Sequence, residues 1–577
     1  MKKRKLFLIV LIFALTMALA ACHKPDPGPE SAPESAEDDL YTVIYMYDGG
    51  YIETLELPAD KVDERVMENI VIDGETYGFA GWQKEIDEEA RTVVATATFT
   101  RLPARADNLL PARAVDGGKL FAPDAQNEVL VVFVSFTDGP SIDRDEFEAL
   151  FTGDFSGTDT LRSVSAYYRA NSYGLDLLHF NFIYYDSGMT SAEAWHYVND
   201  EDENGRFVGN DFFFNIFDSL NASGGHDFSR FDADGDGFVD LSLFIFGEDT
   251  DKTPDGASIY GSASGFSDRI ARGEKTELGQ YVKIGYSRIA GELLPAEQIG
   301  GIRVLIHEIG HAFGIPDYYD FYWYNDTIIS PLGLFDMHES DRGDLNPFSK
   351  FMLGWLHPYV ITEDFDRITL RLACSSTRDD AILIPTSAGW NGTAFDEYLL
   401  IDVMAPQGAN GFDWPAVRDY DEVYEEGTPH PSGGVRIYHV DARLAEIAQG
   451  GTLLPVDDPI AAAAAGKRLT TRFYNTNGID PAIPGDDRTY HLLEIVPRDG
   501  SGRFRLGTPT YASIFAVFCT KDLFGPGDVF DPSAAPECFA GGAVMNNGGT
   551  LDYQITVDAF DESAGIATVT ITKISHE

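Results

Sequence analysis

The chain has 577 residues, with 42 lysines and arginines against 93 aspartates and glutamates, and its formal net charge at pH 7 is −51. A chain this acidic is a poor partner for nucleic acid, because binding to phosphates needs a basic patch. The length leaves room for about four domains of ordinary size. The hydrophobic fraction of 44% is that of a globular protein with sizeable cores.

Residues 1–21 are typical of a lipoprotein signal peptide. Four basic residues at positions 2–5 precede an apolar run over residues 6–19, which is too short to span a bilayer comfortably. Leu19-Ala20-Ala21-Cys22 resembles a bacterial lipobox, which implies cleavage before Cys22 and a lipid on that cysteine. The alternative is an ordinary signal peptide with an incidental cysteine. The resemblance predicts an extracytoplasmic protein that is anchored to the bacterial membrane or cell surface and does not span it.

The next two segments predict a tether and a small β module. Residues 22–40 are rich in proline, glutamate and serine, a composition typical of a disordered tether. Strand-like runs over 41–47 and 92–99 flank Tyr77-Gly78-Phe79-Ala80-Gly81-Trp82. This arrangement resembles the Listeria–Bacteroides surface repeat, which implies a β-grasp-like module over residues 41–102 with a spacer role.

Prolines and a glycine pair make residues 103–118 a predicted linker, after which a larger α+β domain occupies residues 119–358. The continuous apolar run Val-Leu-Val-Val-Phe-Val-Ser-Phe at 129–136 is typical of a buried central strand. Helical spacing follows at 161–170 and 211–220, with a strand-like run between them at 176–185.

An acidic loop lies within this domain. Its carboxylates alternate around two glycines, at Asp232, Asp234, Asp236 and Asp240. Oxygen ligands with glycine at the bend suit a hard cation, so the loop predicts a calcium site. It departs from an EF-hand, because Leu243 occupies the twelfth position and a strand-like segment follows. A merely acidic turn is the alternative.

The strongest motif is Val-Leu-Ile-His-Glu-Ile-Gly-His-Ala-Phe-Gly-Ile-Pro-Asp-Tyr-Tyr-Asp at residues 304–320. His307 and His311 stand four apart, which places both imidazoles on one helix face where they can share a metal ion. Gly314 and Pro316 end the helix, so the chain can bring Asp317 back as a third ligand. Asp320 is the alternative third ligand. Three protein ligands with one open position are typical of catalytic zinc.

Glu308 is the predicted general base. Zinc bound by the three ligands would polarise a scissile carbonyl and lower the pKa of its water from 15.7 toward about 7. Glu308 lies next to His307 and could take the water's proton and deliver it to the leaving amine. The donor that stabilises the oxyanion stays open among four nearby tyrosines, which are Tyr318, Tyr319, Tyr322 and Tyr324.

The zinc motif resembles that of the immune inhibitor A family of bacterial secreted metallopeptidases, which are relatives of the metzincins. Segments 346–356 and 434–441 also resemble parts of that family. The resemblance implies a metzincin-like catalytic domain with protein or peptide substrates, and a methionine turn beneath the metal. Met337 is the candidate methionine. Many relatives have one residue between the aspartate and the methionine, whereas Asp336 directly precedes Met337, so an ordinary core methionine is the alternative.

Residues 359–577 predict an all-β, sandwich-like region, with strands at 368–372, 397–403, 434–440, 491–496 and 566–574. His439 and Asp441 could contact a metal or be structural. With Cys22 assigned to lipid, the remaining cysteines are Cys374, Cys519 and Cys538. Cys519 and Cys538 could form a bridge.

Taken together, these patterns predict a lipid-anchored, extracytoplasmic zinc endopeptidase that also binds calcium. One alternative is a surface adhesion protein in which the zinc helix is purely structural. Glu308 argues against it, because a structural zinc site has no use for a carboxylate base. Another alternative is a metal-dependent hydrolase that acts on something other than peptides.

Overall fold

The fold is described from a computed structural model of the chain. It describes residues 40–58, 61–62, 65, 67, 69–73, 75–112, 115, 121–199, 209–233, 235–254, 261–264, 278–279, 281–286, 302–319, 331–333, 335–362, 365–414, 433–473, 490–502, 522–535, 537–539 and 544–574. The predicted signal peptide and residues 22–39 of the predicted tether lie outside these residues, as do Asp234, Asp320 and Cys519. Leu40, the last residue of the predicted tether, begins the first strand. None of the described helices is long and apolar enough to cross a membrane.

Contacts between Cα atoms divide the chain into a small unit, built from residues up to Leu102, and a large unit built from almost all the rest. The small unit is one five-stranded sheet with the order β2-β1-β5-β4-β3. Its strands are β1 (Leu40–Tyr47), β2 (Gly50–Pro58), β3 (Ile70–Ile72), β4 (Glu75–Asp87) and β5 (Thr92–Arg101). A tight turn follows β1, with Asp48 and Gly49 both at positive φ.

The large unit contains a five-stranded sheet with the order β7-β6-β8-β10-β9. Its strands are β6 (Asn127–Ser135), β7 (Leu178–Asp186), β8 (Ser242–Gly247), β9 (Gly261–Ser264) and β10 (Tyr281–Gly285). All pairings are parallel except the one between β9 and β10. The sequence's prediction of a buried central strand at 129–136 is confirmed by β6.

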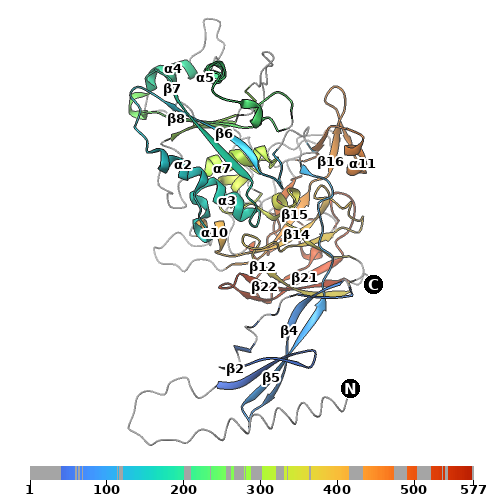
Figure 1. The fold of residues 1–577 in the computed structure, drawn as a ribbon. Coiled ribbons are helices and arrows are strands. Elements are labelled where there is room, and N and C mark those ends of the chain that lie inside the picture. The colour runs from blue at the N-terminus through green and yellow to red at the C-terminus, as the bar shows by residue number, and fades with distance from the viewer. Residues whose placement is uncertain are drawn as a thin grey trace, which may run out of the picture. The chain divides into compact units, whose positions relative to one another are not determined.

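Helices cover both faces of this sheet (Figure 1). Along β6, Leu130, Val132 and Val134 pack into a core with α4 (Ser191–Asn199) and α5 (Gly209–Ala222). The intervening residues of β6, Val129, Val131 and Phe133, pack into the opposite core. That core also holds side chains of α2 (Arg144–Thr152), α3 (Val164–Asn171) and α7 (Ile302–Ala312). Alternation along the strand therefore buries both faces of the sheet.

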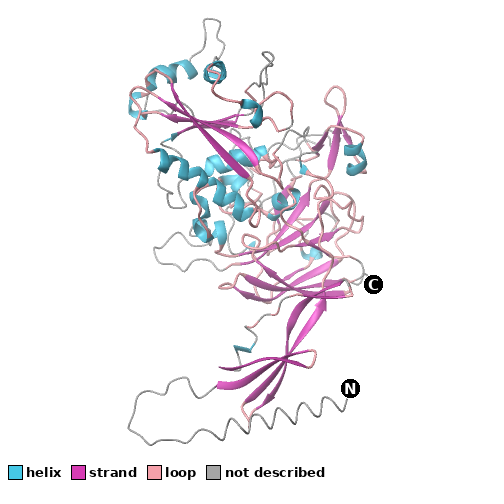
Figure 2. Ribbon diagram, in the orientation of Figure 1, coloured by secondary structure: helices cyan, strands magenta, loops and turns pink. Residues whose placement is uncertain are grey.

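Beyond residue 358, strands are the main regular secondary structure among the described residues, and loops connect them. Figure 2 shows the strands in magenta. They form three sheets, ordered β11-β13-β14-β15-β19, β12-β22-β21-β20 and β17-β16-β18. Their bounds are β11 (Tyr359–Val360), β12 (Arg367–Ala373), β13 (Ile382–Pro385), β14 (Glu397–Met404), β15 (Gly434–Asp441), β16 (Leu444–Ile447), β17 (Leu453–Pro455), β18 (Leu469–Thr471), β19 (Leu493–Ile495), β20 (Val529–Phe530), β21 (Tyr553–Asp561) and β22 (Ile566–Lys573). Short helices α8 (Met337–Ser340), α9 (Pro347–Met352), α10 (Gly408–Asp413) and α11 (Pro459–Ala464) complete the unit.

One hydrophobic core joins the helix layer to these strands. It contains Leu305 and Ile309 of α7 together with Leu400 of β14 and Tyr438 of β15. The sequence predicted a boundary between residues 358 and 359, but the described residues on its two sides belong to one compact unit. The observed fold is thus mixed α/β with several sheets, and the five strands predicted beyond residue 359 are all present.

Part of the predicted linker is packed into the same unit. Arg105 forms a β-bridge with Tyr359, and Val115 forms one with Leu469. Ala106, Leu110, Ala112 and Val115 are each at most 5% exposed and lie in the main core. The described apolar residues of the predicted linker therefore contribute to the core of the large unit.

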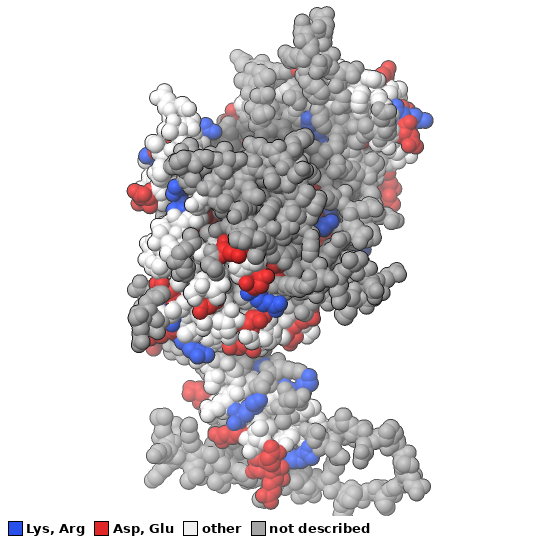
Figure 3. Space-filling model, turned by 180° about the vertical axis from the view of Figure 1, so that it is seen from behind, with Lys and Arg blue, Asp and Glu red and all other residues white. Residues whose placement is uncertain are grey.

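The described surface carries both signs of charge. On the face drawn in Figure 3, acidic side chains are interspersed with lysines and arginines. Several basic side chains are held in ion pairs within the large unit: Arg105 with Asp380, Arg169 with Asp154, and Arg230 with Glu128. The carboxylate of each pair offsets the charge of its arginine, so these arginines add little positive potential to the surface.

Candidate metal centre

Helix α7 carries the His-Glu-Ile-Gly-His motif and ends where the sequence predicted. The Ile315 amide donates to the Gly310 carbonyl, and the Gly314 amide donates to the His311 carbonyl. Gly314 has a φ of +91°, the left-handed conformation that glycine adopts without strain at a helix end. The chain then turns back through Pro316, which returns Asp317 to the face of the helix that carries the histidines.

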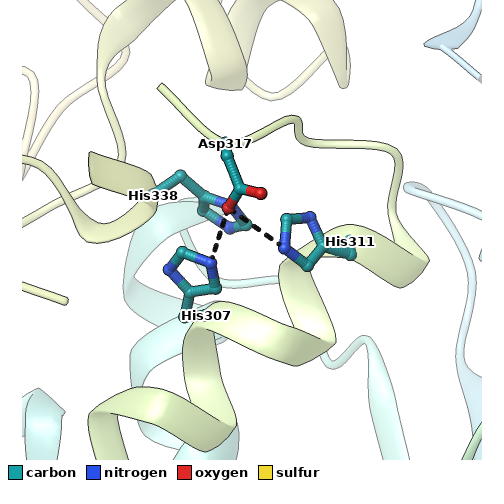
Figure 4. A group of neighbouring side chains, drawn as sticks. All are labelled: His307, His311, Asp317 and His338. Atoms are coloured by element: carbon teal, nitrogen blue, oxygen red, sulfur yellow. Dashed lines mark hydrogen bonds and ion pairs between the residues drawn. The ribbon is translucent and has the colours of Figure 1, made fainter. Parts of the chain in front are cut away.

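His307, His311 and Asp317 meet as predicted. The Nε2 atom of His307 lies 2.9 Å from Oδ1 of Asp317, and Nε2 of His311 lies 3.3 Å from the same oxygen. Figure 4 shows the Asp317 carboxylate directed toward both rings, which come from the same helix. The two imidazoles and the carboxylate therefore converge on one small volume, and Asp317 is the predicted third ligand that the described structure places there.

Hydrogen bonds on the far side of each ring fix its orientation. Nδ1 of His307 lies 2.9 Å from the Met337 carbonyl oxygen and 3.0 Å from Oδ1 of Asp341. Nδ1 of His311 lies 2.8 Å from the Ile315 carbonyl oxygen. These acceptors favour the tautomer with a proton on Nδ1, which leaves the Nε2 lone pair facing the centre. Metal-ligating histidines are usually oriented in this way.

A third histidine, which the sequence analysis missed, completes the group. Ligand atoms of His307, His311, Asp317 and His338 all lie within 4.8 Å of one another. The His338 ring is fully buried and stacks on His307, with ring centroids 4.5 Å apart and an interplanar angle of 21°. It comes from α8, a different element from the motif helix, so no spacing within the motif could point to it.

Met337, the predicted floor of the site, is fully buried and begins α8. It contributes its carbonyl oxygen to His307. The Oδ1 atom of Asp336 caps α8 by accepting the amide of His338 at 2.8 Å. The ring that faces the two motif histidines thus belongs to the residue after Met337. A floor role for the Met337 side chain stays a prediction.

Glu308 is partly buried beside this group. Burial raises the pKa of its carboxyl above the ordinary value, against the opposing attraction of His311 and His307. Burial also acts to raise the pKa of Asp317, but its close contacts with the His307 and His311 rings hold that pKa well below its ordinary range. Burial lowers the pKa of His338 well below its ordinary value, so its ring is neutral. An ionised carboxylate and a neutral imidazole are the forms that bind a metal.

Two of the four candidate tyrosines are described. The Tyr318 hydroxyl is buried and lies 2.7 Å from the Ser349 hydroxyl, which engages it within the core. Tyr319 lies at the site, with its ring centroid 6.3 Å from that of His307 and a hydrogen bond to Asp317. Of these two, Tyr319 is the one placed to contact a bound molecule. Tyr322 and Tyr324 lie outside the described residues.

The acidic loop folds around its own carboxylates. The two oxygens of Asp232 accept the amides of Asp236 and Gly237, each at 2.9 Å. Oδ2 of Asp240 accepts the amide of Ala233 at 2.9 Å. β8 follows the loop, so the predicted departure from an EF-hand is confirmed. Calcium binding there stays a prediction, and Asp234 lies outside the described residues.

His439 and Asp441 lie in a different network, on β15. Nδ1 of His439 is 3.1 Å from Oε1 of Glu494, and Nε2 is 2.9 Å from Oε1 of Glu397. Asp441 pairs with Arg443 at 2.7 Å. Because carboxylates engage both ring nitrogens, the structure favours the structural interpretation of His439. Cys374 and Cys538 are buried, and Cys519 lies outside the described residues.

The donor set of the four-residue group suits a metal ion. Imidazole nitrogens and a carboxylate oxygen are ligands that Zn²⁺ takes readily. Within the described part of the chain, neither ring nitrogen of His338 has a hydrogen-bond partner, so the group also contains polar atoms that an ion would satisfy. Comparisons of the whole chain with protein-family models and with curated proteins found no match.

Proposed function

We propose that this chain is a zinc-dependent endopeptidase whose large unit has a metzincin-like catalytic arrangement. His307, His311 and Asp317 would hold the ion. The observation that carries this proposal is the convergence of two Nε2 atoms on one Asp317 oxygen, at 2.9 and 3.3 Å, with each Nδ1 atom engaged by an oxygen behind it. Such support behind each ligand is what holds a metal site in shape.

When bound, zinc would supply Lewis acidity and would lower the pKa of a water molecule toward neutrality. Glu308 would accept that water's proton and return it to the leaving amine. Its partly buried carboxyl lies where it interacts electrostatically with His307, His311 and Asp317, so it is close to the proposed reacting atoms. Tyr319 is a candidate donor to the developing oxyanion, because it lies beside Asp317.

The adhesion alternative would need a closed structural zinc site with no role for Glu308. Glu308 is only partly buried, as are His311 and Asp317, so its carboxylate can reach solvent or a bound molecule. The anchoring of the protein through a lipid on Cys22 and its extracytoplasmic location are part of the same proposal. They rest on the N-terminal pattern alone.

Casein cleavage by the purified chain, with and without a zinc chelator, tests the proposal. We expect cleavage that the chelator abolishes and that added zinc restores. A small-ester substrate run in parallel separates a peptidase from a hydrolase of another class. Zinc binding without cleavage of either substrate would favour the adhesion alternative.

A further inference from the structure

We propose that His338 is a fourth protein ligand of the same metal ion, so that three imidazoles and one carboxylate hold it. The inference rests on the metal site of the proposed function, but not on peptide-bond cleavage. The sequence assigned two histidines and an aspartate, and the third histidine emerges only from the packing of α8 against α7.

The first argument is the burial of a polar ring that has no partner. His338 is 0% exposed, and among the described residues neither Nδ1 nor Nε2 has a hydrogen-bond partner. A buried polar atom left unsatisfied costs about 1–3 kcal/mol, and such atoms are rare in folded proteins. Coordination to an ion would satisfy one of these nitrogens at the place where three other ligand atoms already gather.

The second argument is the direction in which the ring points. Gly310 lies three residues after His307, so these two residues are neighbours on one side of α7. A Cβ atom built on Gly310 would stand 2.0 Å from Nε2 and 2.5 Å from Cε1 of His338. The nitrogen-bearing edge of His338 therefore rests against the helix at Gly310, beside His307. Glycine in this helix makes room for the third imidazole.

The third argument is the relation of the rings in space. The centroid of the His338 ring lies 4.5 Å from that of His307, and the two ring planes make an angle of 21°. The centroid lies 5.0 Å from that of His311, and those two planes make an angle of 79°. Figure 4 shows the Asp317 carboxylate among all three rings. The same volume is thus surrounded by two rings from α7, one ring from α8 and the carboxylate of Asp317, which lies in the loop after α7. Four protein ligands are the usual number in a closed structural zinc site, so a catalytic water would require either expansion to five ligands or the release of one protein ligand.

Replacing His338 by phenylalanine tests the inference, because phenylalanine keeps an aromatic ring of similar size and removes both nitrogens. We expect the zinc dissociation constant of the full chain, measured by competition with a chelator, to rise by more than about 100-fold. That exceeds the 10–100-fold loss typical of removing an outer partner of a ligand. His226→Phe is the matched control, because His226 is exposed and lies against Phe228 away from the group. Its zinc affinity should be unchanged.

Cobalt substitution provides a second readout that does not depend on affinity. The visible absorption of the cobalt-loaded chain should change in shape and intensity in His338→Phe, because the ion loses a ligand. If His338→Phe does not fold, as judged by circular dichroism of the metal-free protein, His338→Leu takes its place, because leucine is apolar and offers no ligand atom. An unchanged cobalt spectrum and a zinc affinity within tenfold of the wild type would overturn the inference.

The outcomes also separate this inference from the proposed function. If the wild-type chain binds zinc and cleaves casein while His338→Phe binds zinc equally well, only the fourth-ligand assignment fails. If His338→Phe loses zinc but the zinc-loaded wild type cleaves nothing, the assignment stands and the peptidase proposal fails.

Discussion

Arg303 on α7 and Asp413 on α10 form a buried ion pair, with their side chains 3% and 0% exposed. The second oxygen of Asp413 accepts the amide of Gly343 at 2.7 Å. Arg303 in turn donates to the Asp341 carbonyl at 3.4 Å, and the Asp341 carboxylate lies 3.0 Å from Nδ1 of His307. Asp413 therefore ties the first turn of the motif helix to the loop that orients a proposed ligand.

Asp413→Ala should destabilise the chain strongly, because it leaves Arg303 buried without its charge partner. We expect a loss of about 3–5 kcal/mol in the free energy of unfolding, the usual cost of breaking a buried pair. Denaturant unfolding measures it. Asp154→Ala is the control, since the Asp154 carboxylate pairs with Arg169 while 91% exposed, and its loss should cost less than about 1 kcal/mol. Equal effects of the two substitutions would contradict the scaffold role of Asp413.

Glu308→Ala should remove nearly all peptidase activity while zinc stays bound. Glu308 is not a proposed ligand, so its loss removes only the proton acceptor, an effect typically of about 10²–10⁴-fold. His311→Ala should lower zinc occupancy as well as activity, because it removes a ligand. Metal analysis and casein cleavage compare the two variants. Glu85→Ala, at an exposed position of β4, is the control and should change neither. Zinc loss from Glu308→Ala equal to that from His311→Ala would make Glu308 a ligand instead.

Gly310→Ala should lower the melting temperature of the metal-free chain. A glycine in a helix interior is ordinarily about 1 kcal/mol worse than alanine, so the usual effect of this change is stabilising. Here the added Cβ would meet His338 Nε2 at 2.0 Å and the Tyr168 hydroxyl at 3.2 Å, within a packed core. Gly225→Ala is the control, because its nearest neighbour would be the Ser223 hydroxyl at 3.9 Å. A rise in melting temperature for Gly310→Ala would show that His338 does not press against the helix.

His439 should make the stability of the chain fall at alkaline pH. Burial acts to lower its pKa, but hydrogen bonds to Glu397 and Glu494 raise the pKa to about 9, from an ordinary value of 6.5. His491 also bonds Glu494, at 2.9 Å, from the same side of the network. Because the pKa is higher in the folded state, protonated His439 stabilises the fold, and this contribution is fully present below about pH 6.5. The contribution is lost as the pH rises through about 9.

Urea unfolding at pH 6 and at pH 10 measures this loss, in a Glu308→Ala background that avoids self-digestion. Between pH 6 and pH 10, the free energy of unfolding should fall by on the order of 3 kcal/mol more in the chain with His439 than in the His439→Gln chain. Parallel pH dependence in the two chains would show that His439 is not charged between its carboxylates.

The acidic loop should bind calcium and support stability through mass action on the folded state. The melting temperature should rise in millimolar calcium, because calcium would neutralise carboxylates held together by their own loop amides. Asp234→Ala combined with Asp236→Ala should abolish the rise. Asp145→Ala combined with Asp159→Ala, on exposed positions elsewhere, should preserve it. A calcium response that survives the loop substitutions would remove the loop from the proposed sites.

Sequence reasoning succeeded where the relevant distances are set within one element. The spacing of His307 and His311 fixes their common face, and the glycine at 314 fixes the end of α7, so both could be predicted. His338 could not, because its position depends on how α8, capped by Asp336, packs against α7. Spacing within a motif carries no information about such a tertiary contact.

The same limit explains the differences in domain organisation. The prolines and glycines of residues 103–118 indicate only the local backbone conformation. The burial of Leu110 and Val115 depends on contacts with residues that are distant in the sequence, such as the bridge between Val115 and Leu469. The composition change after residue 358 is real, since strands dominate there. This composition change marks a change of secondary structure and not a domain boundary, because apolar residues from both sides of residue 358 pack in one core.

That shared core has a consequence for how the chain tolerates cutting. Leu305 and Ile309 behind the two proposed histidine ligands pack in the same cluster as Leu400 and Tyr438. Removing the segment after residue 358 would therefore strip apolar cover from the back of α7, and a minimal fragment of residues 119–358 is not expected to fold. A chain built in this way would resist proteolytic cleavage in its folded state, because α7 and the C-terminal strands that share its core would unfold together.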